Sequence, residues 1–439
     1  MAKAKHHQYL SRYAEPESRQ LPAIHAHWDH VVVVPACDEG DDLFALLQSV
    51  RRAAGDTRVL TIIVVNGRED VASQVHQQNT RCLKRLAEQY PAEEFHPGMW
   101  MHSSTAQDLL WIDRATPNRY LPPRQGVGLA RKIGCDVAAA LHARDPIRSG
   151  WLTSTDADAI LPPDAFTRLP PAADVSAVTF PFQHQLEPPH DEAMALYELS
   201  LHHYVLGLEH ARSPYAFHTI GSALGFSIDA YIAVRGFPKR QAGEDFYLLN
   251  KLAKVGRIER RSGHSISLRG RPSQRVPFGT GPAIRKIHQE DTHSMYHPAI
   301  FDELRILLQT LRAFGDHGNI QILKAANSPA SWGGLIALGF EPLLARLGSL
   351  PPKQRHHQIH GWFDGFKTMK WIHHRRDTSW PSLPWRECVE AAPWFGKLSQ
   401  TSDPEQALRL ARTTLRAMRT KNPYPSKPRS SSMSAYQGQ

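Results

Sequence analysis

Cysteine is scarce in this sequence, with four residues in a chain of 439. Cys37, Cys82, Cys135 and Cys388 lie far apart, and no two of them form a C-x-x-C pair. This spacing predicts reduced thiols and argues against a disulfide framework or a cysteine-rich zinc site. Histidine is common, with 25 residues, but none forms an H-E-x-x-H motif or another recognisable ligand spacing.

Long apolar runs are also missing. No stretch reaches the roughly 18 uncharged apolar residues that a membrane span needs. The nearest candidate, residues 332–347, is interrupted by Glu341 and Arg346. The first seven residues lack the apolar run of a signal peptide. We therefore expect a cytoplasmic protein, with contact at the inner face of the membrane as the alternative.

Acidic residues are in deficit. The chain has 52 Lys and Arg against 42 Asp and Glu, which gives a formal net charge of +10. Such a balance favours acidic partners such as nucleotides, phosphorylated substrates or anionic lipids. A nucleic-acid partner is not expected, because no RNA-binding signature or aromatic-basic strand motif is present. A basic surface without a specific partner is the simpler interpretation of the charge alone.

Strand and helix patterns alternate in the first half of the chain. Four consecutive valines in residues 30–35 predict a strand buried on both faces, which is typical of a parallel sheet. Pro35 is expected to end this strand. The alternation predicts an α/β fold with a doubly wound, mostly parallel, Rossmann-like sheet, which binds ligands at the carboxyl ends of its strands. Further strands are predicted at 59–65, 109–112 and 151–155, with helices between them.

The second half is less regular and becomes mostly helical after about residue 285. Residues 421–439 are rich in Ser, Pro and Lys, which is typical of a disordered tail. The predicted organisation is a flexible N-terminal arm (1–28), a catalytic-type α/β domain (29–285, with halves 29–165 and 166–285), a C-terminal helical extension (286–420) and the tail.

Two carboxylates one residue apart follow the predicted strand at 151–155. Residues i and i+2 of an extended segment point to the same side, so Asp156 and Asp158 are expected to converge on one cation. Oxygen ligands suit Mg²⁺ or Mn²⁺. The simpler interpretation is a pair of turn residues before Pro162 and Pro163.

Other polar clusters lie at the ends of predicted strands or the starts of predicted helices. Taken singly, each fits a helix-start charge pair or a solvated helix face. Taken in order, they resemble family 2 glycosyltransferases of the GT-A fold over roughly residues 30 to 256. The matching segments are Val33–Glu39 (close to V-P-x-Y-N-E), Val64–Gly67, Gly128–Gly134 (G-x-A-R-N-x-G), Thr155–Asp158 (D-x-D) and Gly236–Leu248 (G-G-F-x…x-E-D-x-x-L).

Three departures from the family pattern matter. Asp38 stands where Asn is usual, which adds a charge. Residues 68–125 are long for this position and suggest an accessory flap. No Q-x-x-R-W motif of the processive polysaccharide synthases is present, which argues against that class.

The resemblance implies a metal-dependent hexosyltransferase that moves one sugar from a nucleotide diphosphate-sugar to an acceptor hydroxyl. The acceptor is unknown and would be a glycan, a lipid or a small molecule. Asp245 would be the base and Glu244 its fallback, with inversion at the anomeric carbon. Asp156 and Asp158 would hold Mg²⁺ or Mn²⁺, which stabilises the departing diphosphate. The remaining residues implied to bind the donor are Pro35, Glu39 and Asn66 at the base or ribose, and Arg131 and Lys132 at the diphosphate.

Further contacts are predicted outside these motifs. His218 is a candidate contact to sugar or acceptor, although a single histidine is more often structural. Arg271 and Arg275 lie in a basic loop that could close over the diphosphate. A basic helical face with Trp362 and Phe366 is interpreted as packing, with peripheral membrane contact as the alternative.

Three alternative functions stay open at this point. The nearest are a nucleotidyltransferase and a retaining glycosyltransferase on a similar sheet. The former normally shows a Gly-rich, Lys-containing loop after its first strand, which Cys37–Gly40 matches poorly. A third alternative is a catalytically silent protein that binds nucleotides or nucleic acid.

Overall fold

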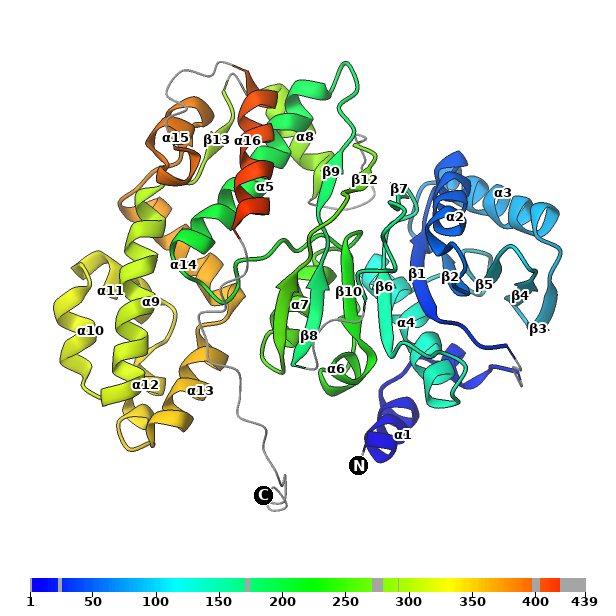
Figure 1. Cartoon of the computed structure of the whole chain (residues 1–439), viewed down its shortest axis with the longest axis horizontal. Helices are drawn as coiled ribbons and strands as arrows, with labels where there is room; N and C mark the ends of the chain where they lie inside the picture. The colour runs from blue at the N-terminus through cyan, green and yellow to red at the C-terminus, as the bar shows by residue number, and fades with distance from the viewer. Residues whose placement is uncertain are drawn as a thin grey trace.

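A computed structural model describes residues 2–22, 26–169, 174–270, 279–290, 292–396 and 403–418. A large sheet occupies the centre and right of the molecule in Figure 1, and a group of helices lies at the left. The strands are β1 (His30–Ala36), β2 (Val59–Asn66), β3 (Glu93–His96), β4 (Met99–Ser103), β5 (Asp108–Arg114), β6 (Trp151–Ser154), β7 (Ala159–Ile160), β8 (Val175–Thr179), β9 (Phe182–His184), β10 (Leu224–Ser227), β11 (Arg257–Arg260), β12 (Ile266–Leu268), β13 (Ser294–Met295) and β14 (Leu383–Pro384).

Helices precede, separate and follow these strands. They are α1 (Ala2–Arg12), η1 (Pro16–Arg19), α2 (Asp41–Ala54), α3 (Ser73–Gln89), α4 (Val127–Ala143), α5 (Asp191–His210), α6 (Ile228–Ala233), α7 (Glu244–Leu252), α8 (Thr280–Gln289), α9 (Ala299–His317), α10 (Ile320–Ala326), α11 (Pro329–Ala337), α12 (Glu341–Leu347), α13 (Pro352–Trp362), α14 (Gly365–Thr378), α15 (Trp385–Ala391), η2 (Pro393–Phe395) and α16 (Pro404–Ala417).

The large sheet has nine strands in the described part of the chain, in the order β11-β8-β10-β6-β1-β2-β5-β4-β3. The pairings make β10 and β4 antiparallel to their neighbours, so the other seven strands run in one direction. The predicted α/β fold with a mostly parallel sheet is confirmed. One detail differs, because β1 continues past Pro35 to Ala36.

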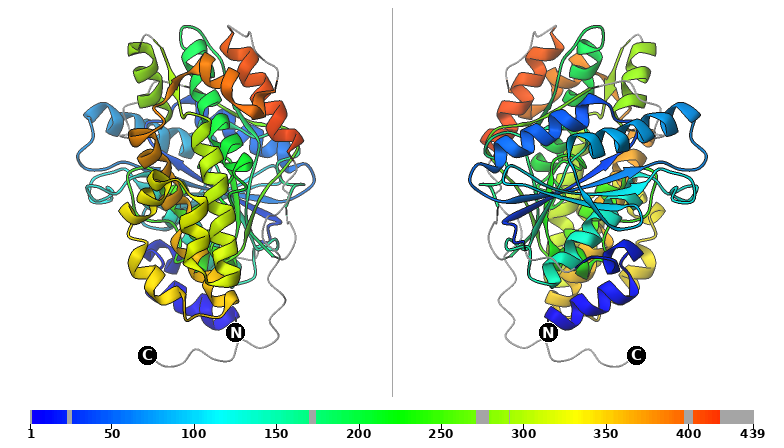
Figure 2. Two further views of the ribbon diagram at one scale, coloured as in Figure 1. Left: turned by 90° about the vertical axis from the view of Figure 1, so that its left-hand side faces the viewer. Right: turned by 90° about the vertical axis from the view of Figure 1, so that its right-hand side faces the viewer.

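Helices cover both faces of this sheet, as the valine-rich first strand predicts. Val31 and Val33 pack in a core with residues of α4, and Val32 and Val34 pack in a second core with residues of α2. Successive side chains of a strand point to opposite faces, so one run of valines serves both cores. Figure 2 shows α2 and α3 on one side of the sheet and α1 with α4 on the other.

The N-terminal segment is packed against the domain, and the prediction of a flexible arm over residues 1–28 is wrong for its described residues. Tyr9 of α1 is 2% exposed and Trp28 is 1% exposed. The Trp28 indole Nε1 donates to Asp108 Oδ2 over 2.8 Å. A few aromatic side chains in a polar segment bury enough surface to dock it. Because these aromatic residues are isolated, they form no periodic hydrophobic pattern from which the docking could be predicted.

Residues 68–125 belong to the sheet and do not form a separate flap. After α3 the chain makes the antiparallel pairs β3–β4 and β4–β5, and β5 then returns to lie parallel to β2. Trp100 of β4 stacks on Trp111 of β5 with ring centroids 6.0 Å apart. The long insertion therefore widens the sheet at the edge farthest from the C-terminal helices.

The C-terminal part is helical, as expected, and its helices share a core with α5. The basic face proposed there is smaller than the sequence suggested. Arg375 is buried, and its guanidinium donates to both carboxylate oxygens of Glu303 at 2.6 and 3.1 Å. Trp362 ends α13 and Phe366 lies in α14, so the two do not share one helix.

No helix among the described residues is long and apolar enough to cross a membrane. Arg271, Arg275 and the tail 421–439 lie outside the described residues. The predictions for them therefore stay predictions. The four cysteines are free thiols, and three of them are buried.

Candidate active site

The candidate site lies at the edge of the sheet where β1, β2 and β6 end. Ser154, the last residue of β6, pairs with Val33 of β1 and with Leu224, the first residue of the antiparallel β10. The loop that carries Asp156 starts directly after Ser154. Carboxyl ends of parallel strands are the usual ligand edge of such sheets, so the position agrees with the sequence expectation.

Arg131 joins the end of β6 to the start of α7. Its Nε donates to Glu244 Oε1 over 2.8 Å, and its Nη1 donates to the Ser154 hydroxyl over 2.6 Å. Its Nη2 forms an ion pair with Asp156 Oδ1. The guanidinium is 2% exposed, whereas the Asp156 side chain is 38% exposed. One buried cation therefore holds two separately predicted clusters, Asp156 and Glu244–Asp245, at one place.

Glycines let the chain close around this arginine. A Cβ on Gly221 would lie 2.5 Å from Arg131 Nη2, so only glycine leaves room for the guanidinium. A Cβ on Gly128 would lie 2.5 Å from the Pro238 carbonyl oxygen, and one on Gly134 would lie 2.4 Å from Val33 Cγ1. The two motif glycines thus allow α4 to pack tightly on the loop before α7 and on β1.

Carboxylates outnumber cations around Arg131. Burial lowers its pKa, but Asp156, Glu244 and Asp245 together outweigh burial and raise the pKa above its ordinary value. Three carboxyl groups surround one guanidinium, so acidic groups exceed basic groups at this place. An excess of negative charge at a partly exposed carboxylate suits a divalent cation.

The two candidate bases differ in their environment. Glu244 is 4% exposed and is held by Arg131. Burial, followed by repulsion from Glu244, raises the pKa of Asp245 to about 7, against the opposing effect of Arg131. Its Oδ1 accepts a hydrogen bond only from the backbone N–H of Phe246 among the contacts that the described residues show, at 2.7 Å. A carboxyl group with a pKa of about 7 is suited to accept a proton near neutral pH.

Asp158 follows Asp156 in the same loop, directly before the small sheet formed by β7, β12 and β9. Its carbonyl oxygen accepts from the backbone N–H of Arg269 at 3.3 Å. The Arg269 guanidinium pairs with Asp42 Oδ1 at 2.5 Å, and Asp158 also contributes to raising the Arg269 pKa. The basic loop that starts at Arg269 therefore leaves the sheet beside Asp158.

Glu39 and Asn66 are buried at the ends of β1 and β2. The Asn66 amide donates to the Ala36 and Val64 carbonyl oxygens, both at 3.1 Å. Asn66 thus ties two strand ends together, and its amide hydrogens are used within the protein. The Glu39 carbonyl oxygen accepts a hydrogen bond from Gln78 Nε2 at 3.0 Å, so α3 holds the segment that follows β1.

Lys132 does not face the site, and the prediction that it meets a diphosphate is wrong. Its Nζ donates to Asp136 Oδ2 over 2.8 Å and to the Tyr9 hydroxyl over 3.0 Å. Asp136 lies one turn further along α4 and Tyr9 lies in α1, so Lys132 belongs to a different polar network from Arg131. Adjacent helical residues point about 100° apart, so Arg131 and Lys132 reach different surroundings.

His218 is packed among aromatic rings. Its ring lies 5.0 Å from that of Phe182 and 4.9 Å from that of His202, both edge to face. Burial, followed by His202, lowers the His218 pKa well below its ordinary value, so the ring is neutral. These contacts favour the structural interpretation that the sequence left open.

Sequence reasoning missed Ser154 and Tyr197. Ser154 reads as an ordinary strand residue, and Tyr197 fits the apolar spacing of α5. Burial raises the pKa of Tyr197, and Asp245 adds to the increase, so the phenol lies within electrostatic reach of that carboxylate. Thr280 Oγ1 contacts the Tyr197 hydroxyl at 3.5 Å, and the His184 ring lies 5.7 Å from the tyrosine ring.

No group of three or more His, Cys, Asp or Glu side chains in the described residues is arranged to hold a metal by itself. Asp156 and Asp158 offer carboxylate oxygens only. Mg²⁺ is commonly held by one or two carboxylates together with substrate phosphates, and this donor set fits that arrangement.

Comparisons with known proteins assign no family. No family model and no curated protein matches the chain. Among solved structures, S. aureus TarS 1-349 in complex with UDP-GlcNAc is 9% identical, with a TM-score of 0.35, over 80% of this chain and 92% of the other. The mannosyltransferase PcManGT from Pyrobaculum calidifontis, in complex with GDP-Man and Mn²⁺, is 14% identical, with a TM-score of 0.34, over 86% of this chain and 100% of the other. Similarity at this level assigns neither a family nor a function.

Proposed function

We propose that this chain is a divalent-metal-dependent glycosyltransferase that transfers one sugar from a nucleotide diphosphate-sugar to an acceptor hydroxyl, with inversion. The observation that carries the proposal is the Arg131 cluster. It places Asp156, from the D-x-D segment, and the Glu244–Asp245 pair around one buried guanidinium at the carboxyl edge of a mostly parallel sheet. Metal-binding and proton-accepting carboxylates are both needed at one point for this reaction.

Asp158 and the free oxygen of Asp156 would hold Mg²⁺ or Mn²⁺ together with the donor diphosphate. Bound there, the cation would neutralise charge on the leaving diphosphate. Arg131 orients Asp156 through its ion pair. Glu39 would contact the nucleoside, whereas Asn66 would shape the pocket by fixing the ends of β1 and β2.

Asp245 would accept the proton from the acceptor hydroxyl. The acceptor oxygen forms a bond to the anomeric carbon, while the bond from that carbon to the diphosphate oxygen breaks and its electron pair leaves with the nucleoside diphosphate. The proton ends on Asp245. A base with a pKa of about 7 is well matched to this transfer near neutral pH. Tyr197, within electrostatic reach of Asp245, would line the acceptor side together with Thr280, which contacts the Tyr197 hydroxyl.

Calorimetric titration tests donor binding directly. Wild-type protein is titrated with UDP, GDP and other nucleoside diphosphates, with and without Mn²⁺. We expect one nucleotide to bind, about tenfold or more weakly when Mn²⁺ is absent. Asp158→Asn should lose the effect of Mn²⁺. Asp316→Asn is the matched control, because Asp316 is exposed and pairs with His356 among the C-terminal helices.

Two outcomes would count against the proposal. If no nucleotide binds, the chain has no donor site of the proposed kind. If the chain instead binds RNA or DNA in a salt-sensitive way, a nucleic-acid-binding protein is favoured. Among enzymes, analysis of the product anomer separates inversion from retention. Release of pyrophosphate in place of a nucleoside diphosphate would identify a nucleotidyltransferase.

A further inference from the structure

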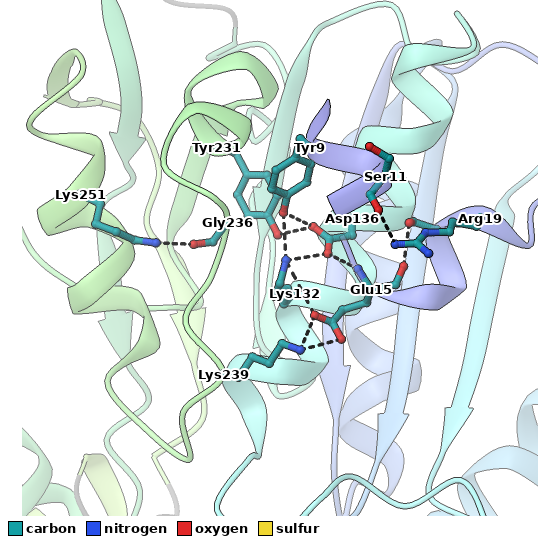
Figure 3. A network of polar contacts seen from close by, with 11 residues as sticks. Tyr9, Ser11, Glu15, Arg19, Lys132, Asp136, Tyr231, Gly236, Lys239 and Lys251 are labelled. Atoms are coloured by element: carbon teal, nitrogen blue, oxygen red, sulfur yellow. Dashed lines mark hydrogen bonds and ion pairs between the residues drawn. The ribbon is translucent and has the colours of Figure 1, made fainter. Parts of the chain in front are cut away.

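A buried polar network links the N-terminal segment to α4, and Asp136 is at its centre (Figure 3). The Asp136 side chain is fully buried. Its Oδ1 accepts from the Tyr9 hydroxyl at 2.5 Å and from the Tyr231 hydroxyl at 2.9 Å. Its Oδ2 accepts from Lys132 Nζ and from the Glu15 backbone N–H, both at 2.8 Å. Four donors on one carboxylate fix this part of α4 to residues 9–15.

The same network extends to the loop that precedes α7, residues 236–243. The Glu15 carboxylate pairs with Lys239 Nζ, at 2.7 Å through Oε1 and 3.0 Å through Oε2. Gly236, which starts the loop, has a φ of 70°. A Cβ there would lie 2.6 Å from the Tyr9 hydroxyl, so the loop packs directly on the tyrosine. The N-terminal segment therefore holds α4 and this loop at the same time.

Both of the parts that it holds carry groups of the candidate site. Arg131 is the neighbour of Lys132 on α4, and the loop ends where Glu244 begins α7. The two parts also contact each other directly, because the Gly128 N–H donates to the Arg240 carbonyl oxygen over 3.1 Å. A shift of the loop relative to α4 would change the contact between Arg131 and Glu244.

We propose that Tyr9, Glu15 and Lys239 are positioning residues that set Asp245 and Glu244 against Arg131. The catalytic consequence rests on the proposed function, whereas the positional consequence does not. None of the three residues contacts the candidate site, so they act through α4 and the loop. Removing one of them is expected to loosen residues 236–246 without removing a group that binds the donor.

The charges in the network decide which variant is informative. Lys132 and Lys239 balance Asp136 and Glu15. Replacing Asp136 or Lys132 would leave the other charged and buried, and such a chain is expected to fold poorly. The Lys239 side chain is 43% exposed, so Lys239→Met removes the link to the loop at low cost. Lys239→Arg keeps a cation that can pair with Glu15.

The experiment measures amide hydrogen exchange and kinetics on the full chain. In Lys239→Met and Tyr9→Phe, amides of residues 236–246 should exchange at least about fivefold faster than in wild type, because local opening becomes easier. With UDP-GlcNAc or GDP-mannose and Mn²⁺, whichever donor wild type turns over, kcat should fall about tenfold while the donor KM stays within about twofold. Lys239→Arg should restore both values.

His6→Ala is the matched control. It removes another contact of the same segment, from His6 Nε2 to Asp229 Oδ1 of α6 at 2.5 Å, which does not involve the loop. It should leave exchange in residues 236–246 and kcat unchanged. Unchanged exchange in Lys239→Met and Tyr9→Phe would overturn the proposal. If wild type turns over no nucleotide sugar, the proposed function fails, and faster exchange in the variants would still support the positioning role.

Discussion

Arg131 holds the site together at the scale of single residues. The charge of Arg131 is buried. The pairing with Asp156 and Glu244 offsets the free-energy cost of removing this charge from water. Removing one partner of a buried ion pair leaves the other charged and without compensation, which costs far more than losing a surface pair. The same arginine thus stabilises the fold and orders the carboxylates.

Replacing Arg131 with Met should destabilise the protein by about 3–5 kcal/mol, because Glu244 would stay buried without its cation. Urea unfolding measures this change. Arg68→Met is the control, since Arg68 pairs with an exposed Asp70 and should cost at most about 1 kcal/mol. A loss for Arg131→Met as small as that of the control would contradict the assigned role.

Asp245 should make stability depend on pH. Burial raises its pKa from 3.8 to about 7. A raised carboxyl pKa gives stability that is complete below about pH 4 and is lost as the pH rises through about 7. Relative to wild type, Asp245→Asn should therefore gain about 2–3 kcal/mol between pH 5 and pH 8. Urea unfolding at both pH values checks this. A difference that does not change with pH would show that Asp245 has an ordinary pKa when folded.

Side-chain direction limited what could be predicted about individual residues. The order of motifs predicted that Asp156, Arg131 and the Glu244–Asp245 pair lie around one donor, with Arg131 at its diphosphate. The structure joins these groups, but it buries Arg131 against Asp156 and Glu244. The order of motifs also assigned Lys132 to the same site, but one step along a helix turns a side chain by about 100°. Ser154 carries no sequence signal, because its role depends on which arginine reaches it.

At the scale of elements, α16 is attached to α5 through a buried carboxylate. Glu198 of α5 is fully buried and accepts from Arg412 Nε at 2.6 Å, His202 Nε2 at 3.0 Å and His184 Nδ1 at 2.9 Å. Burial raises the Glu198 pKa, but these hydrogen bonds outweigh it and lower the pKa below its ordinary value. The carboxylate is therefore ionised at neutral pH.

Arg412→Met should destabilise the protein at pH 7 by about 2–4 kcal/mol, because Glu198 would lose its permanent cation. The lowered pKa means that this contribution is complete above about pH 5 and declines only in strong acid. Thermal unfolding at pH 7 measures it. Arg409→Met on the same helix is the control, since Arg409 pairs with exposed Asp403 and Glu405. Equal Tm values for the two variants would refute the account of α16.

The elements of the sheet could be predicted from the sequence because their signal is local. Runs such as Val31 to Val34 are buried on both faces and read as central strands. The docking of α1 could not be predicted, since it depends on Tyr9 meeting Asp136, which lies 127 residues away in the chain. The addition of β3 and β4 to the sheet could not be predicted either, because it depends on pairing between strands that are partly exposed and lack a strong hydrophobic pattern.

At the scale of the whole molecule, α5 connects the sheet with the C-terminal helices. Leu199 and Leu206 of α5 lie in the core of the C-terminal helices, and Leu201 packs against the core of the sheet. A helix shared by two cores couples their stability. The division into a catalytic-type domain and an extension therefore describes the order along the chain better than it describes independent folding units.

This sharing predicts one cooperative unfolding transition. Trp28 and Trp111 report on the sheet, and Trp371 and Trp385 report on the C-terminal helices, and all four are buried. In wild type, urea unfolding followed by tryptophan fluorescence and by far-ultraviolet circular dichroism should give the same midpoint, within about 0.3 M. Separate midpoints would show that the two parts unfold independently.

The central claim is that this chain transfers a sugar with Asp245 as the base. The most direct measurement is consumption of nucleotide sugars with Mn²⁺ or Mg²⁺, over a panel that includes UDP-GlcNAc and GDP-mannose, by wild type and by Asp245→Asn. We predict that wild type releases a nucleoside diphosphate from one donor in the presence of metal. Asp245→Asn should bind that donor with similar affinity but turn it over at least about 100-fold more slowly. Full turnover by Asp245→Asn, or no turnover of any donor by wild type, would contradict the account.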